Sequence, residues 1–257
     1  MAALVAASRR FEALDGLRGI AALAVAFGHA VPGHRNTALA VDFFFVLSGL
    51  VLTHSYGERL QQGLPFAQYI RARLIRLFPM IWLGMAIGFL SHPYFPWGAL
   101  LIPVPGDFMF PLDRPAWSLL FEMIASVLVG LGLWRGWRLV PLTVLGAVGM
   151  TIAIVHAGVV DRGIAISQLH YGLTRVIFGF GMGMLIYRVQ PKVSAHPLAL
   201  CGLLAVLLLQ PWWSWQYQLA MVLVACPLIV AAAANAKNFA GARQLGELSY
   251  PLYIVHW

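Results

Sequence analysis

Charged residues are scarce in this chain of 257 residues: Asp, Glu, Lys and Arg together make up 10% of it. Soluble domains carry about 25% charged residues, so the composition excludes an ordinary soluble globular protein. Cysteine is nearly absent as well. Cys201 and Cys226 lie inside apolar runs without a metal-ligand spacing, which predicts small buried packing residues.

The common catalytic signatures are also missing. The sequence contains no HExxH, GxSxG, P-loop or paired-cysteine pattern, so it gives no support for metal-dependent hydrolysis, a serine triad or ATP binding. A glycine cluster at Gly179, Gly181 and Gly183 is typical of close helix packing rather than of a nucleotide loop. We expect no bound metal.

Hydrophobic residues, in contrast, make up 61% of the chain, and the mean hydropathy is +0.80. These values are typical of a membrane protein. The formal net charge of +8 comes from cations spread between apolar runs, which do not form a basic face for nucleic acid. We therefore predict membrane lipid, and no nucleic acid, as a partner.

Nine apolar segments predict an all-α integral membrane protein, a polytopic helical bundle of about nine spans. The segments cover roughly 14–31, 40–56, 74–92, 116–134, 139–156, 173–188, 197–211, 217–235 and 246–257. The last segment is too short to span, which predicts a single domain, residues 1–257, truncated within the ninth span.

The distribution of basic residues supports this count. With the N-terminus inside, twelve cations fall on the cytoplasmic side and four on the other, which is the positive-inside pattern. The cytoplasmic residues are Arg9, Arg10, Arg59, Arg71, Arg73, Arg76, Arg135, Arg138, Arg188, Lys192, Lys237 and Arg243. The others are Arg35, Arg114, Arg162 and Arg175. We expect the cell (inner) membrane, with a cytoplasmic N-terminus.

Two polar residues share one face of the first apolar segment. Arg18 and His29 are eleven positions apart, which is roughly three helical turns and about 16 Å along the axis. Charged groups in a membrane are costly and persist where they face a protein interior or a polar cavity. Asp15, one turn before Arg18, is expected to pair with it and lower that cost.

A cluster of arginines precedes the third segment. Arg71, Arg73 and Arg76 fall within six residues, and the last two are spaced i and i+3 on one helical face. One interpretation is a topology anchor that attracts anionic lipid. The other is a set of donors for phosphate groups, for which arginine is well suited.

A carboxylate is predicted at the depth of His29. Glu122 lies within about 9 Å of the outer end of the fourth segment, where it would orient the histidine ring and raise its basicity. The alternative is a buried glutamate that only satisfies a neighbour. Asp42, Tyr253 and His256 are further polar candidates for the same layer.

Several stretches together resemble the acyltransferase 3 family of integral membrane O-acyltransferases, which includes bacterial O-antigen and exopolysaccharide acetyltransferases. The match runs from residue 11 to the last residue. The stretches are residues 14–19 with His29 (an Arg-x10-His pattern), residues 42–49, Arg73 and Arg76 (Arg-x-x-Arg) with Pro79 and Trp82, residues 117–119 with Glu122, and residues 245–250 with Leu252, Tyr253 and His256.

The resemblance implies ten spans in the complete protein and transfer of an acyl group, most often acetyl, from cytoplasmic acyl-CoA to a hydroxyl of a glycan or lipid-linked acceptor. Acyl-CoA would be a co-substrate, with no permanently bound cofactor. In this interpretation the three arginines and Arg18 hold the donor, and His29 is the general base, with Glu122 orienting it or binding the acceptor. An acyl-histidine intermediate is the alternative mechanism.

Two other functional classes remain open. A secondary transporter would also need ionisable residues at mid-depth, although the sequence shows no pair of inverted repeats. A structural membrane protein would have no need for a histidine aligned with a cluster of arginines.

Overall fold

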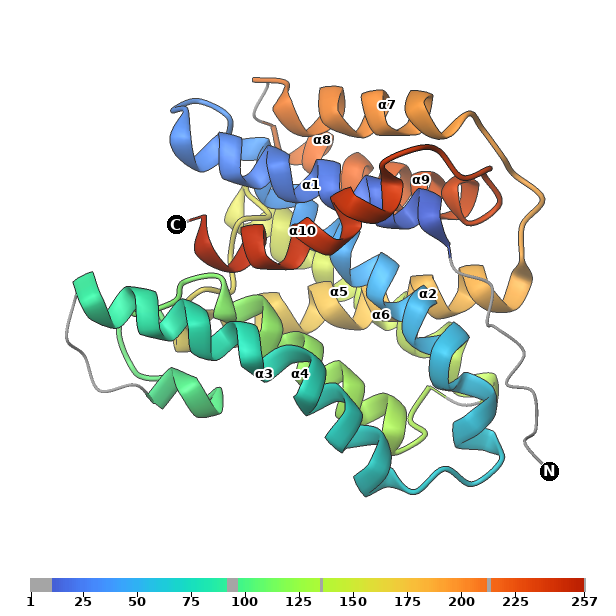
Figure 1. Ribbon diagram of the computed structural model, residues 1–257, viewed down its shortest axis with the longest axis horizontal. Helices are drawn as coiled ribbons and strands as arrows, with labels where there is room; N and C mark the ends of the chain where they lie inside the picture. Colours follow the sequence, from blue (N-terminus) through green and yellow to red (C-terminus); the bar gives the residue numbers. More distant parts are fainter. Residues whose placement is uncertain (1–10, 92–96, 135, 212–213, 257) are drawn as a thin grey trace.

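The structure, a computed structural model, describes residues 11–91, 97–134, 136–211 and 214–256 (Figure 1). Arg9, Arg10 and Arg135, which the topology prediction places on the cytoplasmic side, and the last residue, Trp257, lie outside this part of the chain. In the described residues the secondary structure is helical throughout. An all-α fold is therefore confirmed.

Each of the nine predicted segments is occupied by helix. The α-helices are α1 (Glu12–Ala30), α2 (Ala40–Gln61), α3 (Phe66–Ser91), α4 (Ala116–Gly130), α5 (Leu139–Ala157), α6 (Leu169–Val189), α7 (Pro197–Leu209), α8 (Trp215–Ala220), α9 (Cys226–Ala234) and α10 (Ala242–Val255). A π-helical turn, Met221–Ala225, joins α8 to α9. Pro227, which lacks the N–H of a regular α-helical bond, follows that turn closely.

Five helical stretches are long and apolar enough to cross a membrane, judged by length and composition. They are Asn36–Gln61, Phe66–Ser91, Gly136–Ala157, Ile166–Val189 and Trp215–Ala234. Two shorter apolar helices, α4 and α7, accompany them. Large hydrophobic side chains on α3 and α5 remain exposed, Leu90 and Ile152 among them. An apolar outer face of this kind is expected where lipid, rather than water, surrounds a bundle.

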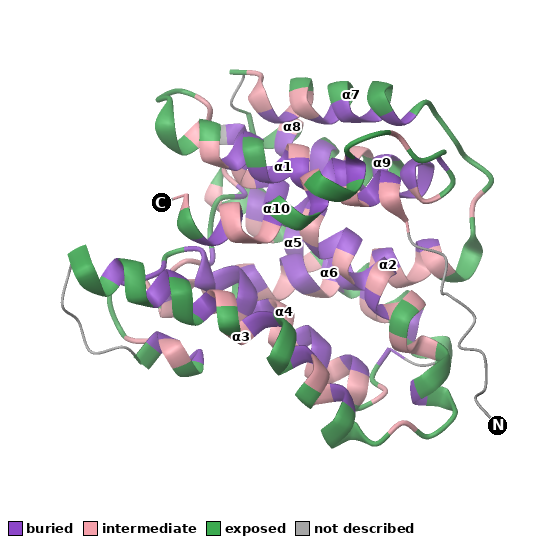
Figure 2. Ribbon diagram, in the orientation of Figure 1, coloured by how far each residue is buried: buried purple, intermediate pink, exposed green. Residues whose placement is uncertain are grey.

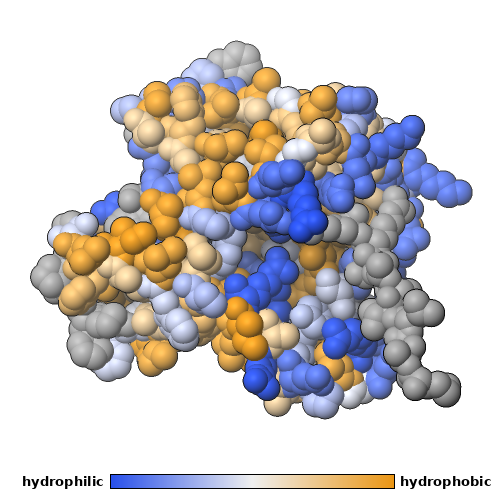
Figure 3. All heavy atoms as spheres, viewed as in Figure 1, coloured by the Kyte–Doolittle hydropathy of each residue, from blue (hydrophilic) through white to orange (hydrophobic). Residues whose placement is uncertain are grey.

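Figure 1 shows how the helices are arranged. α1 lies along α10, with α7 beside it, and both α1 and α10 run from right to left in this view. α2 packs against α6, α6 against α5, and α3 against α4. Hydrophobic residues dominate the left half of the surface in Figure 3, whereas hydrophilic residues gather toward its centre and right.

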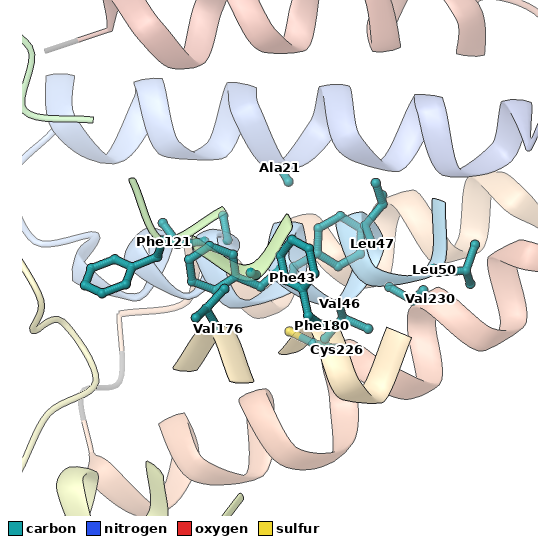
Figure 4. Packing of buried hydrophobic residues seen from close by; sticks show 14 of the residues in the cluster. Ala21, Phe43, Val46, Leu47, Leu50, Phe121, Val176, Phe180, Cys226 and Val230 are labelled. Atoms are coloured by element: carbon teal, nitrogen blue, oxygen red, sulfur yellow. The ribbon is translucent and has the colours of Figure 1, made fainter. Parts of the chain in front are cut away.

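The core lies where α1, α2, α6 and α9 meet. Figure 2 shows buried residues concentrated in the middle of the bundle and exposed ones on the outward faces of α3 and α7. Phe43, Phe180 and Val230 are fully buried there, close to Cys226 (Figure 4). Cys226 and Cys201 are both free and buried, which confirms their prediction as packing residues.

Glycines allow α2 and α6 to approach each other closely. A Cβ atom on Gly183 would collide with the carbonyl oxygen of Val46 and would lie 2.6 Å from the backbone nitrogen of Leu50. A Cβ on Gly179 would lie 2.5 Å from the Cβ of Phe45. These contacts confirm the glycine cluster as a helix-packing feature.

We expect Gly183→Ala to destabilise the protein by about 1–3 kcal/mol, the usual cost of overpacking, because the new methyl group meets α2 backbone that cannot move aside alone. The matched control is Gly202→Ala in α7, where a Cβ would meet nothing within 4 Å. Thermal unfolding in detergent compares the two. Equal unfolding temperatures would show that α2 and α6 are not in this close contact.

Candidate functional site

The helices form two cavities that share part of their lining. The first, here called the Arg18 cavity, has a volume of about 280 Å³ and is lined by residues of α1, α2, α3, α4 and α10. The second, the His29 cavity, has a volume of about 490 Å³ and opens at the end of the bundle where α1 and α10 finish. Val41 and Tyr253 line both cavities. The two cavities are therefore neighbours.

Arg18 joins α1 to α10 at the wall of its cavity. Its Nε donates to the hydroxyl of Ser249 at 2.8 Å, and its Nη2 donates to the carbonyl oxygen of Gly246 at 2.8 Å. The same Nη2 lies 3.2 Å from the Oδ1 of Asp15, which confirms the predicted Asp15–Arg18 pair. The guanidinium is thus held rigidly while one side of it faces the cavity.

The three arginines of α3 do not all point to the same side of the helix. Arg73 and Arg76 line the Arg18 cavity, as their spacing predicts. Arg71 is exposed and is not among the residues that line it. Two positions along a helix correspond to a rotation of about 200°, so Arg71 and Arg73 point to opposite sides. Of the three arginines predicted to bind the donor, Arg73 and Arg76 therefore line this cavity and Arg71 does not, and their donor role stays a prediction.

Glu122 has a different partner from the one expected. Its Oε1 accepts a hydrogen bond from Nη2 of Arg73, and the Nε of Arg73 donates to the hydroxyl of Ser126 at 3.2 Å. Glu122 lines the Arg18 cavity, whereas His29 lines the other one. The predicted contact between Glu122 and His29 is therefore corrected to an ion pair between Glu122 and Arg73. Because Arg73 is buried and paired, Arg76 is the more accessible of the two arginines of α3 that line this cavity.

His29 faces the cavity named after it, beside a second histidine. The ring centroids of His29 and His256 are 4.6 Å apart, and the rings meet edge to face at 75°. The Nδ1 of His256 lies 2.6 Å from the carbonyl oxygen of Tyr253, which can only accept, so this nitrogen carries the proton. The Nε2 of neutral His256 is then an acceptor. The expectation that His256 approaches the layer of His29 is confirmed.

Tyr253 forms the boundary between the cavities. Its hydroxyl lies 2.8 Å from the hydroxyl of Ser118, which in turn donates to the carbonyl oxygen of Pro115 at 3.0 Å. Since the single proton of Ser118 is used in that bond, the tyrosine hydroxyl is the donor between the two. This hydrogen bond fixes the position of Tyr253 where the linings of the two cavities meet.

Asp42 does not take part in either cavity. Its two carboxylate oxygens accept from Nε and Nη2 of Arg175, both at 2.9 Å, and both side chains are 2% exposed. The guanidinium of Arg175 also lies 5.0 Å from the ring centre of Trp117. Asp42, a predicted site candidate, thus lies in a buried ion pair outside both cavities, which the sequence could not show because its partner is 133 positions away.

Sequence reasoning missed three residues that line the His29 cavity: Arg114, Asp161 and Arg162. They lie in the connections before α4 and after α5. Both arginines belong to the small group of cations that the topology prediction assigns to the far side, against the general bias. Their position on the side with few cations was the one indication in the sequence that these two arginines belong to a site. In the described residues no cluster of three or more His, Cys, Asp or Glu side chains could hold a metal ion.

Comparison with known proteins gives the same family that the sequence motifs suggest. The profile of a family described as "Acyltransferase domain" (acyltransferase 3) matches residues 11–257. "Protein 2 in picA locus" of Rhizobium radiobacter is 36% identical over 124 residues, which are 46% of this chain. The alignment covers 63% of that relative, so the chain spans less than two thirds of its length. No solved structure matches.

Proposed function

The chain belongs to the acyltransferase 3 family and is a membrane acyltransferase, and from that premise we propose that it transfers an acetyl group from cytoplasmic acetyl-CoA to a hydroxyl of a glycan or lipid-linked acceptor. The observation that carries this proposal is the pair of cavities meeting at Tyr253. Arg18 and Arg76 line one cavity, and His29 lines the other. Two adjoining cavities could hold two substrates with their reacting atoms close together.

The donor matches the Arg18 cavity by charge. Acyl-CoA carries its phosphates at one end and its thioester at the other. Arg76, exposed at the cavity wall, and Arg18 would hold the phosphates, because arginine makes charge-assisted hydrogen bonds to phosphate. The pantetheine arm would then extend toward Tyr253. The Arg73–Glu122 ion pair is proposed to support the cavity wall between the phosphate-binding arginines and Tyr253.

Chemistry would take place on the far side of Tyr253. For the thioester to reach His29, the hydroxyl of Tyr253 would have to leave Ser118, and it would then be able to donate to the thioester carbonyl. His29 would remove the proton from the acceptor hydroxyl as the hydroxyl oxygen attacks the carbonyl carbon. The C–S bond breaks, and the thiolate of CoA leaves and is protonated. Attack by His29 itself, with an acyl-histidine intermediate, is the alternative.

His256 is proposed to position His29. The two rings are in contact and Nε2 of neutral His256 is an acceptor, so His256 would favour the protonated form of His29 that arises in the reaction.

The topology we propose follows from the positive-inside bias of the basic residues. The Arg18 cavity would open toward the cytoplasm, in the inner membrane, and the N-terminus would lie on the same side.

A photoreactive acetyl-CoA analogue with a diazirine in its acyl group tests the donor site. We expect the analogue to label residues around Tyr253, and unlabelled acetyl-CoA to suppress this labelling. In Arg76→Gln we expect the labelling to fall at least about tenfold, because one charge-assisted contact to the donor is removed. Arg71→Gln is the matched control, because Arg71 is exposed and is not among the cavity-lining residues.

Labelling spread over the lipid-facing surface, without competition by acetyl-CoA, would contradict the donor site. Solute uptake into vesicles that does not depend on acyl-CoA would instead favour a secondary transporter.

A further inference from the structure

The His29 cavity carries arginines on the side of the bundle where the charge bias predicts few. Of the four cations assigned to that side, Arg175 is neutralised by Asp42. The side chain of Arg35 is not described. The remaining two, Arg114 and Arg162, both line the His29 cavity. The positive-inside bias does not explain cations on this side of the membrane. Their position at a cavity therefore points to a role in binding.

Neither arginine has an ion-pair partner among the residues that the structure describes. Asp161 lines the same cavity, but it lies beyond salt-bridge distance of both guanidinium groups. In the Arg18 cavity, by comparison, Arg18 and Arg73 are each paired with a carboxylate, and Arg76 is in no ion pair among the described residues. The His29 cavity therefore offers guanidinium donors that no protein carboxylate occupies.

Both arginines are exposed, and the scaffold contacts the guanidinium of Arg114 and the backbone of Arg162. The guanidinium of Arg114 lies 4.2 Å from the ring centre of Phe108. The backbone of Arg162 is fixed because its carbonyl oxygen accepts a hydrogen bond of 2.9 Å from Nη1 of Arg175. The two connections that carry them are also joined, since the N–H of Met109 donates to the carbonyl oxygen of Ile164 at 2.8 Å. The two connections are therefore fixed relative to each other, and the guanidinium of Arg114, packed on Phe108, would lose little freedom on binding.

We propose that Arg114 and Arg162 form a binding subsite for an anionic group of the acceptor, a carboxylate or a phosphate close to the hydroxyl that His29 activates. Arginine is suited to both anions through paired, charge-assisted hydrogen bonds. The cavity volume of about 490 Å³ is within the usual range of small-molecule sites, about 300–1,000 Å³. This inference rests on the proposed function, because it specifies the substrate class of the same site.

Binding to the purified protein in nanodiscs tests the subsite. Two pairs of probes differ only in charge: an oligogalacturonide with its methyl-esterified form, and farnesyl phosphate with farnesol. We expect at least one anion to bind at least tenfold more tightly than its neutral counterpart. A preference in the first pair identifies a sugar carboxylate, and one in the second pair identifies a lipid phosphate.

The preference is expected to disappear in Arg114→Gln/Arg162→Gln and to weaken with added salt. Lys192→Gln/Lys237→Gln is the matched control, because it removes two exposed cations that line none of the cavities described above. The same preference in both double variants, or none in the unmodified protein, would overturn the subsite. Donor photolabelling that persists in either case would show that the failure concerns the acceptor subsite and not the acyltransferase function.

Discussion

Replacing Asp42 with asparagine is expected to destabilise the protein by about 3–5 kcal/mol, the usual cost of removing one partner from a buried ion pair. Asparagine keeps the shape of the side chain but leaves the charge of Arg175 uncompensated, and both side chains are only 2% exposed. Such a loss is a large fraction of the stability of most folded domains. It would lower the thermal unfolding temperature in detergent far more than Gly183→Ala would.

The effect is expected to extend to the His29 cavity. Arg175 also donates a hydrogen bond to the carbonyl oxygen of Arg162. If Arg175 moves because its charge is no longer compensated, the connection that carries Asp161 and Arg162 loses this hydrogen bond. The control is Arg243→Gln, which removes a surface pair whose side chains are 63% and 55% exposed. Surface pairs contribute about 0–1 kcal/mol. If Asp42→Asn unfolds at the same temperature as this control, the buried pair does not support the fold as described.

The sequence predicted the helices well because hydrophobic periodicity and length carry that information directly. Each of the nine apolar segments is helical in the structure, and the close packing at Gly183 followed from residue size alone. The Asp15–Arg18 pair was predictable for a similar reason. Both residues belong to one helix, where a spacing of three positions fixes their proximity.

Contacts between helices were less predictable. The helical rise predicted Glu122 at the depth of His29, but it does not fix how neighbouring helices are shifted or rotated relative to one another. In the structure Glu122 lies in the Arg18 cavity and faces Arg73 on the neighbouring α3. Asp42 was likewise a plausible site residue until Arg175, from α6, was found to occupy both of its oxygens.

The connections between helices were the least predictable part of the site. Asp161 and Arg162 belong to a short connection without a regular pattern, and their position beside His29 depends on the tertiary contacts of Arg175. His256, in contrast, was expected near this layer, because it follows Tyr253 closely at the end of the last apolar segment. Its contact with His29 agrees with that expectation.

The second large effect is expected from replacing His29, the proposed general base. We expect His29→Gln to reduce the rate of acetyl transfer about 10²- to 10⁴-fold, because glutamine keeps the polarity of the site but cannot accept the proton of the acceptor hydroxyl. His170→Gln is the matched control, since His170 is exposed and lines neither the Arg18 nor the His29 cavity. It is expected to transfer at the unmodified rate.

The most direct measurement is transfer of labelled acetyl from acetyl-CoA to membrane glycans and lipids, with the unmodified protein, His29→Gln and His170→Gln inserted at equal levels. The account predicts label in the acceptor fraction for the unmodified protein and His170→Gln, and almost none for His29→Gln. Equal labelling by all three folded proteins would contradict the central claim that acyl transfer takes place at His29.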